Sequence, residues 1–166
     1  MPAFGCRTPA LPAVLAALAL LTWSARPVRA QADDGCVTRI DHAAVAAAFA
    51  KGMPLLEVAD YKIHASRRDG PGLAEIHTRD TDIAYVLEGA ATLVTGGTAV
   101  DPKPIGPEEL RGSAIRGGET RRLEPGDVVV IPNGVPHWFK QVEAPFRYYV
   151  VKVRQAPRPV AMEVAR

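Results

Sequence analysis

The segment from Gly126 to His137 constrains the fold of this chain more than any other part of it. It reads Gly-Asp-Val-Val-Val-Ile-Pro-Asn-Gly-Val-Pro-His. The β-branched run from Val128 to Ile131 predicts a strand, because it is too short for a buried helix and consists of strand formers. Pro132 ends that strand since it has no amide donor, and Gly134 permits a tight reversal. His137 then begins the next strand, where a rigid element could hold a metal ligand.

The rest of the chain continues this pattern of short strands. Glycine and proline turns separate the strand-like segments, which cover residues 55–67, 73–78, 83–87, 91–95, 120–123, 128–131, 138–142 and 146–153. Such an alternation predicts an all-β fold, either an antiparallel barrel or a sandwich. One helix is expected over Ala43–Lys51, with Asp41 as its N-cap and Gly52 at its end.

Residues 98–125 are the least regular part of the sequence. Pro102, Pro104 and Pro107 interrupt this stretch, and Pro107 could open a short helix. Long irregular connections in compact domains often serve as lids or binding loops. We therefore expect a loop insertion here.

The segment 126–141 resembles the second motif of the cupin superfamily, Gly-x5-Pro-x-Gly-x2-His-x3-Asn, with Gln141 in place of the last residue. Upstream, the stretch ending at Gly89 is similar to the first cupin motif. His77 takes the position of its second histidine, Glu75 replaces its first histidine, and Asp82 replaces its glutamate. The resemblance implies a small single-domain cupin, that is, an antiparallel double-stranded β-helix or jelly-roll barrel with a short N-terminal helix.

The first thirty residues have the features of a cleavable signal peptide. Arg7 precedes an apolar run from Ala10 to Trp23, which is shorter than a membrane span, and Val28-Arg29-Ala30 is a small-x-small cleavage site. We therefore predict a secreted or periplasmic protein that has no membrane contact after cleavage near Ala30; a retained anchor is the alternative. The expected organisation is a signal peptide at 1–30, an N-terminal segment with the helix at 31–52, the barrel at 53–154 and a tail at 155–166.

The charge of the mature chain excludes one class of partner. Cleavage removes three arginines and no acid, so 20 basic residues become 17 against 18 acidic ones, a net charge of −1. A nucleic-acid-binding domain would be basic, so no nucleic-acid partner is expected. Cys6 leaves with the signal peptide and Cys36 then has no partner within the chain. We expect Cys36 to be an unpaired thiol, although in an oxidising compartment it could bridge two subunits.

Four side chains are the candidates for chemistry. Glu75 and His77 are two residues apart on a strand, so they point to the same face. The resemblance implies that Asp82 and His137 turn into the same cavity, which would unite two imidazoles with two carboxylates. A divalent cation would relieve the repulsion between the carboxylates, and this donor set suits iron, manganese or zinc. Whether Glu75 or Asp82 binds the ion directly stays open, and the other would be the catalytic group that moves protons.

The neighbours of these residues yield further expectations. Phe139 shares the face of His137 by alternation and should line the pocket, and Tyr85 and Trp138 are further pocket candidates. We expect His42 and His64 to be solvated. The pairs Arg67-Arg68 and Arg121-Arg122 could bind an anion, but solvated strand ends are the simpler interpretation.

Three functions are compatible with the sequence. The first is an exported metal-dependent cupin that acts on a small polar organic molecule, with dioxygenase, isomerase, decarboxylase and lyase chemistry all open. The second is a metal-free acid–base cupin, an epimerase or dehydratase, in which a carboxyl group of raised pKa works with His77. The third is a non-catalytic cupin that binds or senses a small molecule. A homodimer formed through a sheet edge is a further expectation.

Overall fold

The structure, a computed structural model, describes residues 37–160, 162 and 163. Its elements are α1 (His42–Lys51), β1 (Met53–Glu57), β2 (Tyr61–Arg68), β3 (Ala74–His77), β4 (Asp80–Thr95), β5 (Thr98–Val100), β6 (Lys103–Gly106), β7 (Glu109–Gly112), β8 (Ala114–Arg116), β9 (Glu119–Leu123), β10 (Val128–Ile131), β11 (His137–Arg154) and β12 (Met162–Glu163). Among these residues there is no helix with the length and apolarity needed to span a membrane. The predicted signal peptide and Cys36 lie outside the described residues.

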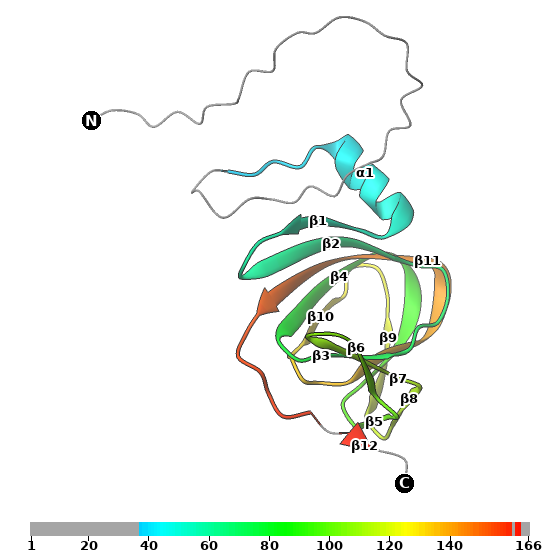
Figure 1. The fold of residues 1–166 in the computed structure, drawn as a ribbon. Helices are drawn as coiled ribbons and strands as arrows, with labels where there is room; N and C mark the ends of the chain where they lie inside the picture. The colour runs from blue at the N-terminus through cyan, green and yellow to red at the C-terminus, as the bar shows by residue number, and fades with distance from the viewer. Residues whose placement is uncertain (1–36, 161, 164–166) are drawn as a thin grey trace, which may run out of the picture.

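The strands curl into a barrel (Figure 1). In the described part of the chain, nine strands form one sheet in which β1, β2, β11, β3, β7 and β6 are successive neighbours, while β4 pairs with β9, β10 and β11. Every pairing within this sheet is antiparallel. A smaller sheet contains β12, β5 and β8. The predicted all-β class and the antiparallel jelly-roll barrel with a short N-terminal helix are confirmed.

The longest strands, β4 and β11, form a ribbon that curves around the barrel (Figure 1). The ribbon bends where the register shifts between Glu143 and Arg147, opposite Gly89. Gly89 has a φ of 74°, and a Cβ there would lie 2.4 Å from the carbonyl oxygen of Pro145. Only glycine fits this bend, because any side chain would meet the facing backbone. The barrel interior beside the bend is filled by apolar residues, among them Leu93, Phe146 and Val86.

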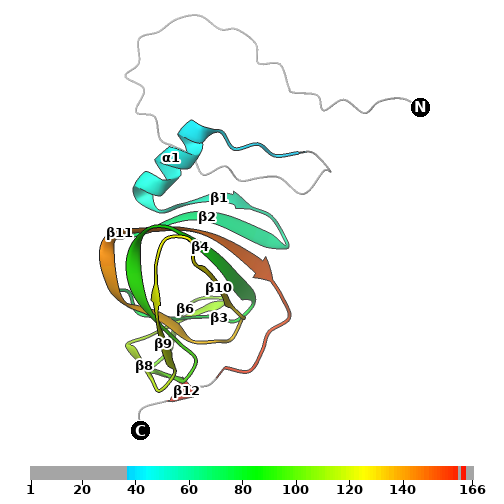
Figure 2. The ribbon, with the colours of Figure 1, turned by 180° about the vertical axis from the view of Figure 1, so that it is seen from behind.

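Helix α1 covers the outside of the barrel over β1 and β2, as both views show (Figures 1 and 2). The side chain of Asp41 accepts the amide hydrogen of Ala44 at 2.8 Å, and Gly52 ends the helix in a left-handed conformation. The apolar face of β2 packs under the helix, where Ile63 and Ala65 join the cluster around Ala48. The polar face of β2 therefore turns inward. This orientation has direct consequences for the site.

The prediction of an irregular loop at residues 98–125 is wrong. Residues 98–116 form four short strands, β5 to β8, and the helix expected after Pro107 does not form, whereas β9 matches the strand expected at residues 120–123. Strand β7 pairs with β3 in a register that places Arg111 beside Glu75 and Glu109 beside His77. The alternation of inward and outward side chains could not be recognised in β5 to β8, because these strands have only three or four residues. The insertion thus forms one wall of the barrel.

The outer face of β4 and β10 carries an exposed apolar patch. It consists of Ile83, Tyr85, Leu87, Val128 and Val130, each between 39% and 63% exposed. The register pairs Tyr85 with Val128 and Ile83 with Val130, so these side chains share one face. Patches of this kind often mark interaction sites. The homodimer expected from the sequence stays a prediction.

Replacing Gly89 by alanine should destabilise the barrel by about 2–4 kcal/mol, because a positive φ and a backbone clash add together. The matched control is Gly70→Ala, since a Cβ at Gly70 would meet nothing within 4 Å. That control should change the free energy of unfolding by less than about 0.5 kcal/mol. Urea unfolding followed by circular dichroism measures both. Equal stabilities of the two variants would contradict the role given to the bend.

Candidate metal centre

Three buried side chains meet inside the barrel. Glu75 and His77 come from β3, and His137 is the first residue of β11. The Oε2 atom of Glu75 lies 3.7 Å from Nε2 of His77 and 3.8 Å from Nε2 of His137. The centroids of the two imidazole rings are 5.1 Å apart. Each residue offers one ligand atom, and these atoms all lie within 4.8 Å of one another. One ion could contact all three.

Hydrogen bonds to the backbone carbonyl groups of His77 and Thr78 join the two motifs that supply these residues. The amide of Gly134 donates to the carbonyl oxygen of His77 at 2.8 Å. The side-chain amide of the buried Asn133 donates to the carbonyl oxygen of Thr78 at 3.1 Å. His137 faces Glu75 directly across the β11–β3 pairing. The Pro-x-Gly turn therefore does more than reverse the chain, because it also fixes one histidine relative to the other.

The hydrogen bonds of the two imidazoles show which nitrogen of each ring is an acceptor. Nδ1 of His137 lies 3.2 Å from the carbonyl oxygen of Val135, which requires a proton on Nδ1 and leaves Nε2 unprotonated. Nε2 of His77 lies 2.9 Å from the ammonium group of Lys152 and accepts from it. With Oε2 of Glu75, three acceptor atoms thus converge. A metal ion that replaces the Lys152 ammonium at Nε2 of His77 could contact all three atoms, so these residues fit a metal ion.

Both histidines are neutral at physiological pH. Burial lowers the pKa of His77 most strongly, the positive charge of Lys152 lowers it further, and the result is about 2. Burial also lowers the pKa of His137. A histidine must be neutral to bind a metal ion. Both ligand nitrogens are therefore available without the loss of a proton.

The carboxyl group of Glu75 is ionised and held in place by two arginines. Its Oε1 atom accepts a hydrogen bond from Arg68 at 2.6 Å and pairs with Arg111. Burial alone would raise the pKa of Glu75, but Arg68, His137 and Arg111 outweigh burial and lower it to about 2. The arginines occupy Oε1, so Oε2 is the atom that points at the histidines. Sequence reasoning missed Arg111, whose strand it took for a loop, and gave Arg68 only as one of a solvated pair.

Asp82 reaches the cavity but lies outside the group of three. Its carboxylate accepts two hydrogen bonds from Lys152, at 2.8 and 2.7 Å, and Oδ2 lies 3.5 Å from Nε2 of His77. The direct pairing of Lys152 with Asp82 across β11 and β4 explains this contact. Lys152 was also missed by sequence reasoning. Strand alternation could have identified it, because Lys152 lies two and four residues after Val150 and Tyr148 on β11, and all three side chains point into the barrel.

The expectation that His64 is solvated is wrong. His64 lines the cavity of about 220 Å³ that contains Glu75, His77 and His137. It also lines a neighbouring hollow, which shares His77 and Lys152 with that cavity. Its Nε2 atom is buried and has no hydrogen-bond partner in the described structure. The reason is that α1 covers the apolar face of β2, so the face with His64, Ser66 and Arg68 points into the barrel.

Of the three aromatic residues predicted to line the pocket, strand alternation directs one into the cavity and two away from it. Phe139 is buried and lines the cavity, on the same face as His137. The structure corrects the other two assignments. Tyr85 is 46% exposed on the outer face of β4, and Trp138 packs beside Ala74 and Val94 with its indole nitrogen donating to the carbonyl oxygen of Gly72 at 2.7 Å. Both residues have the opposite parity to the inward residues of their strands.

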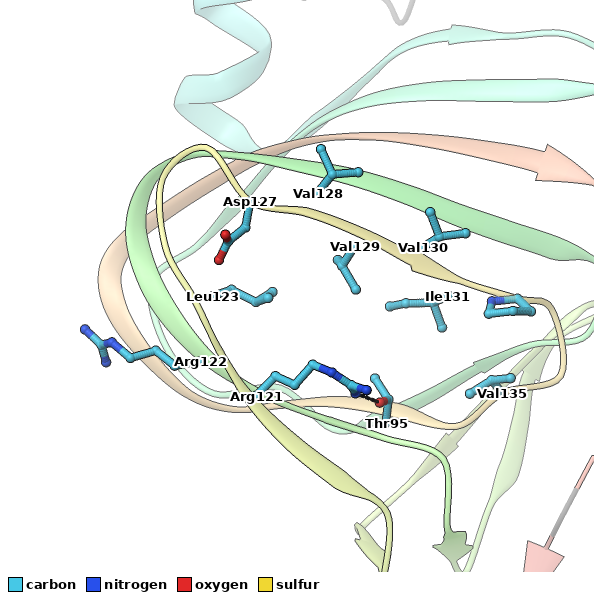
Figure 3. A pocket seen from close by; sticks show the side chains of 11 residues that line it. Thr95, Arg121, Arg122, Leu123, Asp127, Val128, Val129, Val130, Ile131 and Val135 are labelled. Atoms are coloured by element: carbon cyan, nitrogen blue, oxygen red, sulfur yellow. Dashed lines mark hydrogen bonds between the residues drawn. The ribbon is translucent and has the colours of Figure 1, made fainter.

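A second hollow of about 450 Å³ lies between β9 and β10 (Figure 3). Leu123, Val129 and Ile131 form its apolar floor, and Arg121 reaches across to Thr95, to which it donates at 2.9 Å. No histidine lines this hollow, and its arginines already have acidic or hydroxyl partners. It is larger than the cavity around His77, but it brings together no set of ligand atoms.

Comparison with known proteins identifies the family. The Cupin family matches residues 30–160, which is more than half of the chain. This protein is a cupin. The resemblance seen in the two motifs is thereby confirmed, although no curated protein matches this cupin over its sequence.

Several solved structures are similar to this cupin. DMSP lyase DddQ from Ruegeria pomeroyi DSS-3 is 20% identical with a TM-score of 0.41, over 58% of this chain and 40% of the lyase chain. KdgF from Halomonas sp. is 22% identical with a TM-score of 0.40, over 60% of this chain and 72% of that one. Hydroquinone 1,2-dioxygenase PnpCD, in complex with Cd2+ and 4-hydroxybenzonitrile, is 13% identical with a TM-score of 0.47, over 69% and 68% of the two chains. These TM-scores lie below 0.5, so the likenesses say nothing about the reaction of this cupin.

The lowered pKa values of the histidines predict how stability depends on pH. Below pH 6.5 the unfolded chain binds protons that the folded chain does not bind at His77 and His137. The stability of chelator-treated protein should therefore fall as the pH drops from 7 to 5, with a slope that approaches about 1.4 kcal/mol per pH unit from His77 and a further contribution of the same sign from His137. Urea unfolding at several pH values measures this slope.

Two variants control for other titrating groups. The double variant His77→Asn, His137→Asn should have a flatter profile between pH 7 and 5, and His42→Asn, which changes an exposed histidine outside the cavity, is the matched control. Glu75 contributes only near the lower end of this range, because its pKa is 4.5 in the unfolded chain and about 2 in the folded one. An unchanged slope in the double variant would show that the histidines are charged in the folded state.

Proposed function

We propose that this protein is an exported cupin that binds one divalent metal ion at Glu75, His77 and His137 and acts on a small polar organic molecule. One observation carries this proposal. Three unprotonated ligand atoms from β3 and β11 converge within 4.8 Å of one another in a buried cavity. Without a cation, the lone pair on Nε2 of His137 would face the ionised Oε2 atom of Glu75 at 3.8 Å in a region of low dielectric constant, which is unfavourable.

The donor set narrows the choice of metal. Two imidazole nitrogens and one carboxylate oxygen suit iron, manganese or zinc, and no cysteine lines the cavity. Two histidines with one carboxylate leave coordination positions open for a substrate. When bound, such an ion supplies Lewis-acid chemistry or activates dioxygen. Dioxygenase, isomerase, decarboxylase and lyase chemistry all stay open.

The protein's own residues prepare the cavity for a polar ligand. Arg68 and Arg111 keep Glu75 ionised and orient its Oε2 atom toward the histidines. His64 lines the cavity with a buried Nε2 atom that has no partner in the described structure and can hydrogen-bond a substrate. A volume of about 220 Å³ is small for a ligand pocket. The substrate should therefore be a small molecule with several polar groups.

The metal-free acid–base alternative is less well supported. It requires a carboxyl group whose pKa is raised so that it can carry a proton near neutral pH. At Glu75 the pKa moves the other way, to about 2, because two arginines hold the ionised form. Glu75 is therefore suited to binding a cation and poorly suited to moving protons. A proton-transfer role is left to Asp82, beside His77.

Export and the absence of membrane and nucleic-acid partners are parts of the same proposal. They depend on the sequence of residues 1–30 and on the mature charge of −1, obtained from 17 basic and 18 acidic residues. We place the protein in the periplasm or outside the cell, with cleavage near Ala30. Mass spectrometry of the N-terminus of the exported protein tests this placement.

Elemental analysis of protein purified without an affinity tag tests the metal proposal. The unmodified protein should contain about one equivalent of a divalent metal. His77→Ala and His137→Ala should each lower the metal content at least about tenfold, because each removes one of three ligands. His42→Ala, on the exposed face of α1, is the matched control and should keep its metal.

Three other results would decide against the proposal or refine it. Metal-free protein with an intact fold would favour the acid–base alternative. Metal retained in both ligand variants would place the ion elsewhere. A small molecule that raises the melting temperature and is recovered unchanged would favour a binding or sensing protein.

A further inference from the structure

Lys152 occupies a position that bears on how many protein ligands the ion can have. Its ammonium group donates to both carboxylate oxygens of Asp82, at 2.8 and 2.7 Å, and lies 2.9 Å from Nε2 of His77. The side chains of Lys152 and Asp82 are 14% and 10% exposed, so this ion pair is largely shielded from water. Charge-assisted hydrogen bonds of this length are strong.

Asp82 would otherwise be a fourth ligand. Its Oδ2 atom lies 3.5 Å from Nε2 of His77, closer than the Glu75 oxygen at 3.7 Å. Even so, no oxygen of Asp82 belongs to the group whose ligand atoms are all mutually close. Both of its oxygens are directed at Lys152. The carboxylate is thus near the ion's position, but it is engaged by a different cation.

The register of the sheet fixes this arrangement. On the inner face, Lys152 of β11 stands directly between Lys62 of β2 and Asp82 of β4. Lys62 does not compete for Asp82, because it pairs with Asp80 at 3.3 Å and with Glu57 at 3.6 Å. Lys152 therefore has Asp82 as its acidic partner, and the pair forms wherever these strands form.

We propose that Lys152 sets the ligand number of the metal centre by holding Asp82 away from the ion. The centre then has three protein ligands, Glu75, His77 and His137, with the ion replacing the hydrogen bond from Lys152 at Nε2 of His77. The coordination position that Asp82 would take stays open for substrate. This inference rests on the proposed function. It also goes beyond the proposed function, because it assigns a positioning role to a residue that is not itself a metal ligand but contacts both Asp82 and the Nε2 atom of His77.

Metal titration of Lys152→Met tests the inference, with Co2+ and Zn2+ as probes and a chelator as competitor. Methionine has a similar length and no charge, so Asp82 loses its partner and can turn to the ion. The affinity should rise at least about tenfold, because a carboxylate ligand is gained and a repelling charge is lost. The absorption spectrum of bound Co2+ should change, because it reports the ligand set. Adding Asp82→Asn to Lys152→Met should reverse the change in the spectrum and the part of the gain in affinity that comes from the carboxylate.

Lys62→Met is the matched control, since it removes one positive charge from the neighbouring strand and leaves the pair of Lys152 and Asp82 intact. It should leave the Co2+ spectrum unchanged. Equal gains in affinity from Lys62→Met and Lys152→Met would show that the gain comes only from the loss of one positive charge, and this result would overturn the inference. If Lys152→Met does not fold, Lys152→Gln keeps a hydrogen-bond donor without the charge, and the same gain is expected from it.

The experiment separates the two proposals. If the unmodified protein binds metal but Lys152→Met has the same affinity and the same spectrum, the role of Lys152 is wrong and the proposed function stands. If the unmodified protein binds no metal and Lys152→Met does, no three-ligand centre exists for Lys152 to set, and both proposals are wrong. If neither binds metal, both fail.

Discussion

The antiparallel pairing of β4 with β11 is the constraint on which the rest of the structure depends. The bend at Gly89, where no side chain fits against the facing backbone, wraps this ribbon around the barrel. His137 lies at one end of β11, and Lys152 lies near the other. Because the ribbon curves, both residues reach the cavity that His77 enters from β3. A straight ribbon would keep the two ends far apart.

Charge compensation is the second organising feature. Each acidic group of the cavity has a basic partner, with Glu75 between Arg68 and Arg111 and Asp82 against Lys152. Buried charges are tolerated only when they are paired. The two pairings nevertheless differ in a way that matters for function. The arginines occupy one oxygen of Glu75 and leave the other free, whereas Lys152 engages both oxygens of Asp82.

Much of the fold could be predicted, but only part of the cavity. The strand and turn within residues 126–137 could be predicted because a β-branched run, a proline and a glycine each restrict the conformation of their own segment of the backbone. His64 was misjudged because alternation gives two faces without saying which one is inside, and α1 decides that question. Arg111 was missed because β7 has only four residues, too few to show a period. The alternation of side chains along β11 correctly placed Phe139 on the face of His137. Applied to Trp138, the same rule would have excluded it from the cavity.

The sequence by itself determined the class of fold, the family and the two histidines of the site, because these depend on local turn chemistry and on the spacing of residues along strands. Tertiary structure decided which carboxylate faces the histidines and which is held by a lysine. That choice depends on cross-strand register, which joins Glu75 to Arg111 and Asp82 to Lys152. Residues 36 and 70 positions apart became partners only when the strands paired, and no local pattern encodes that pairing.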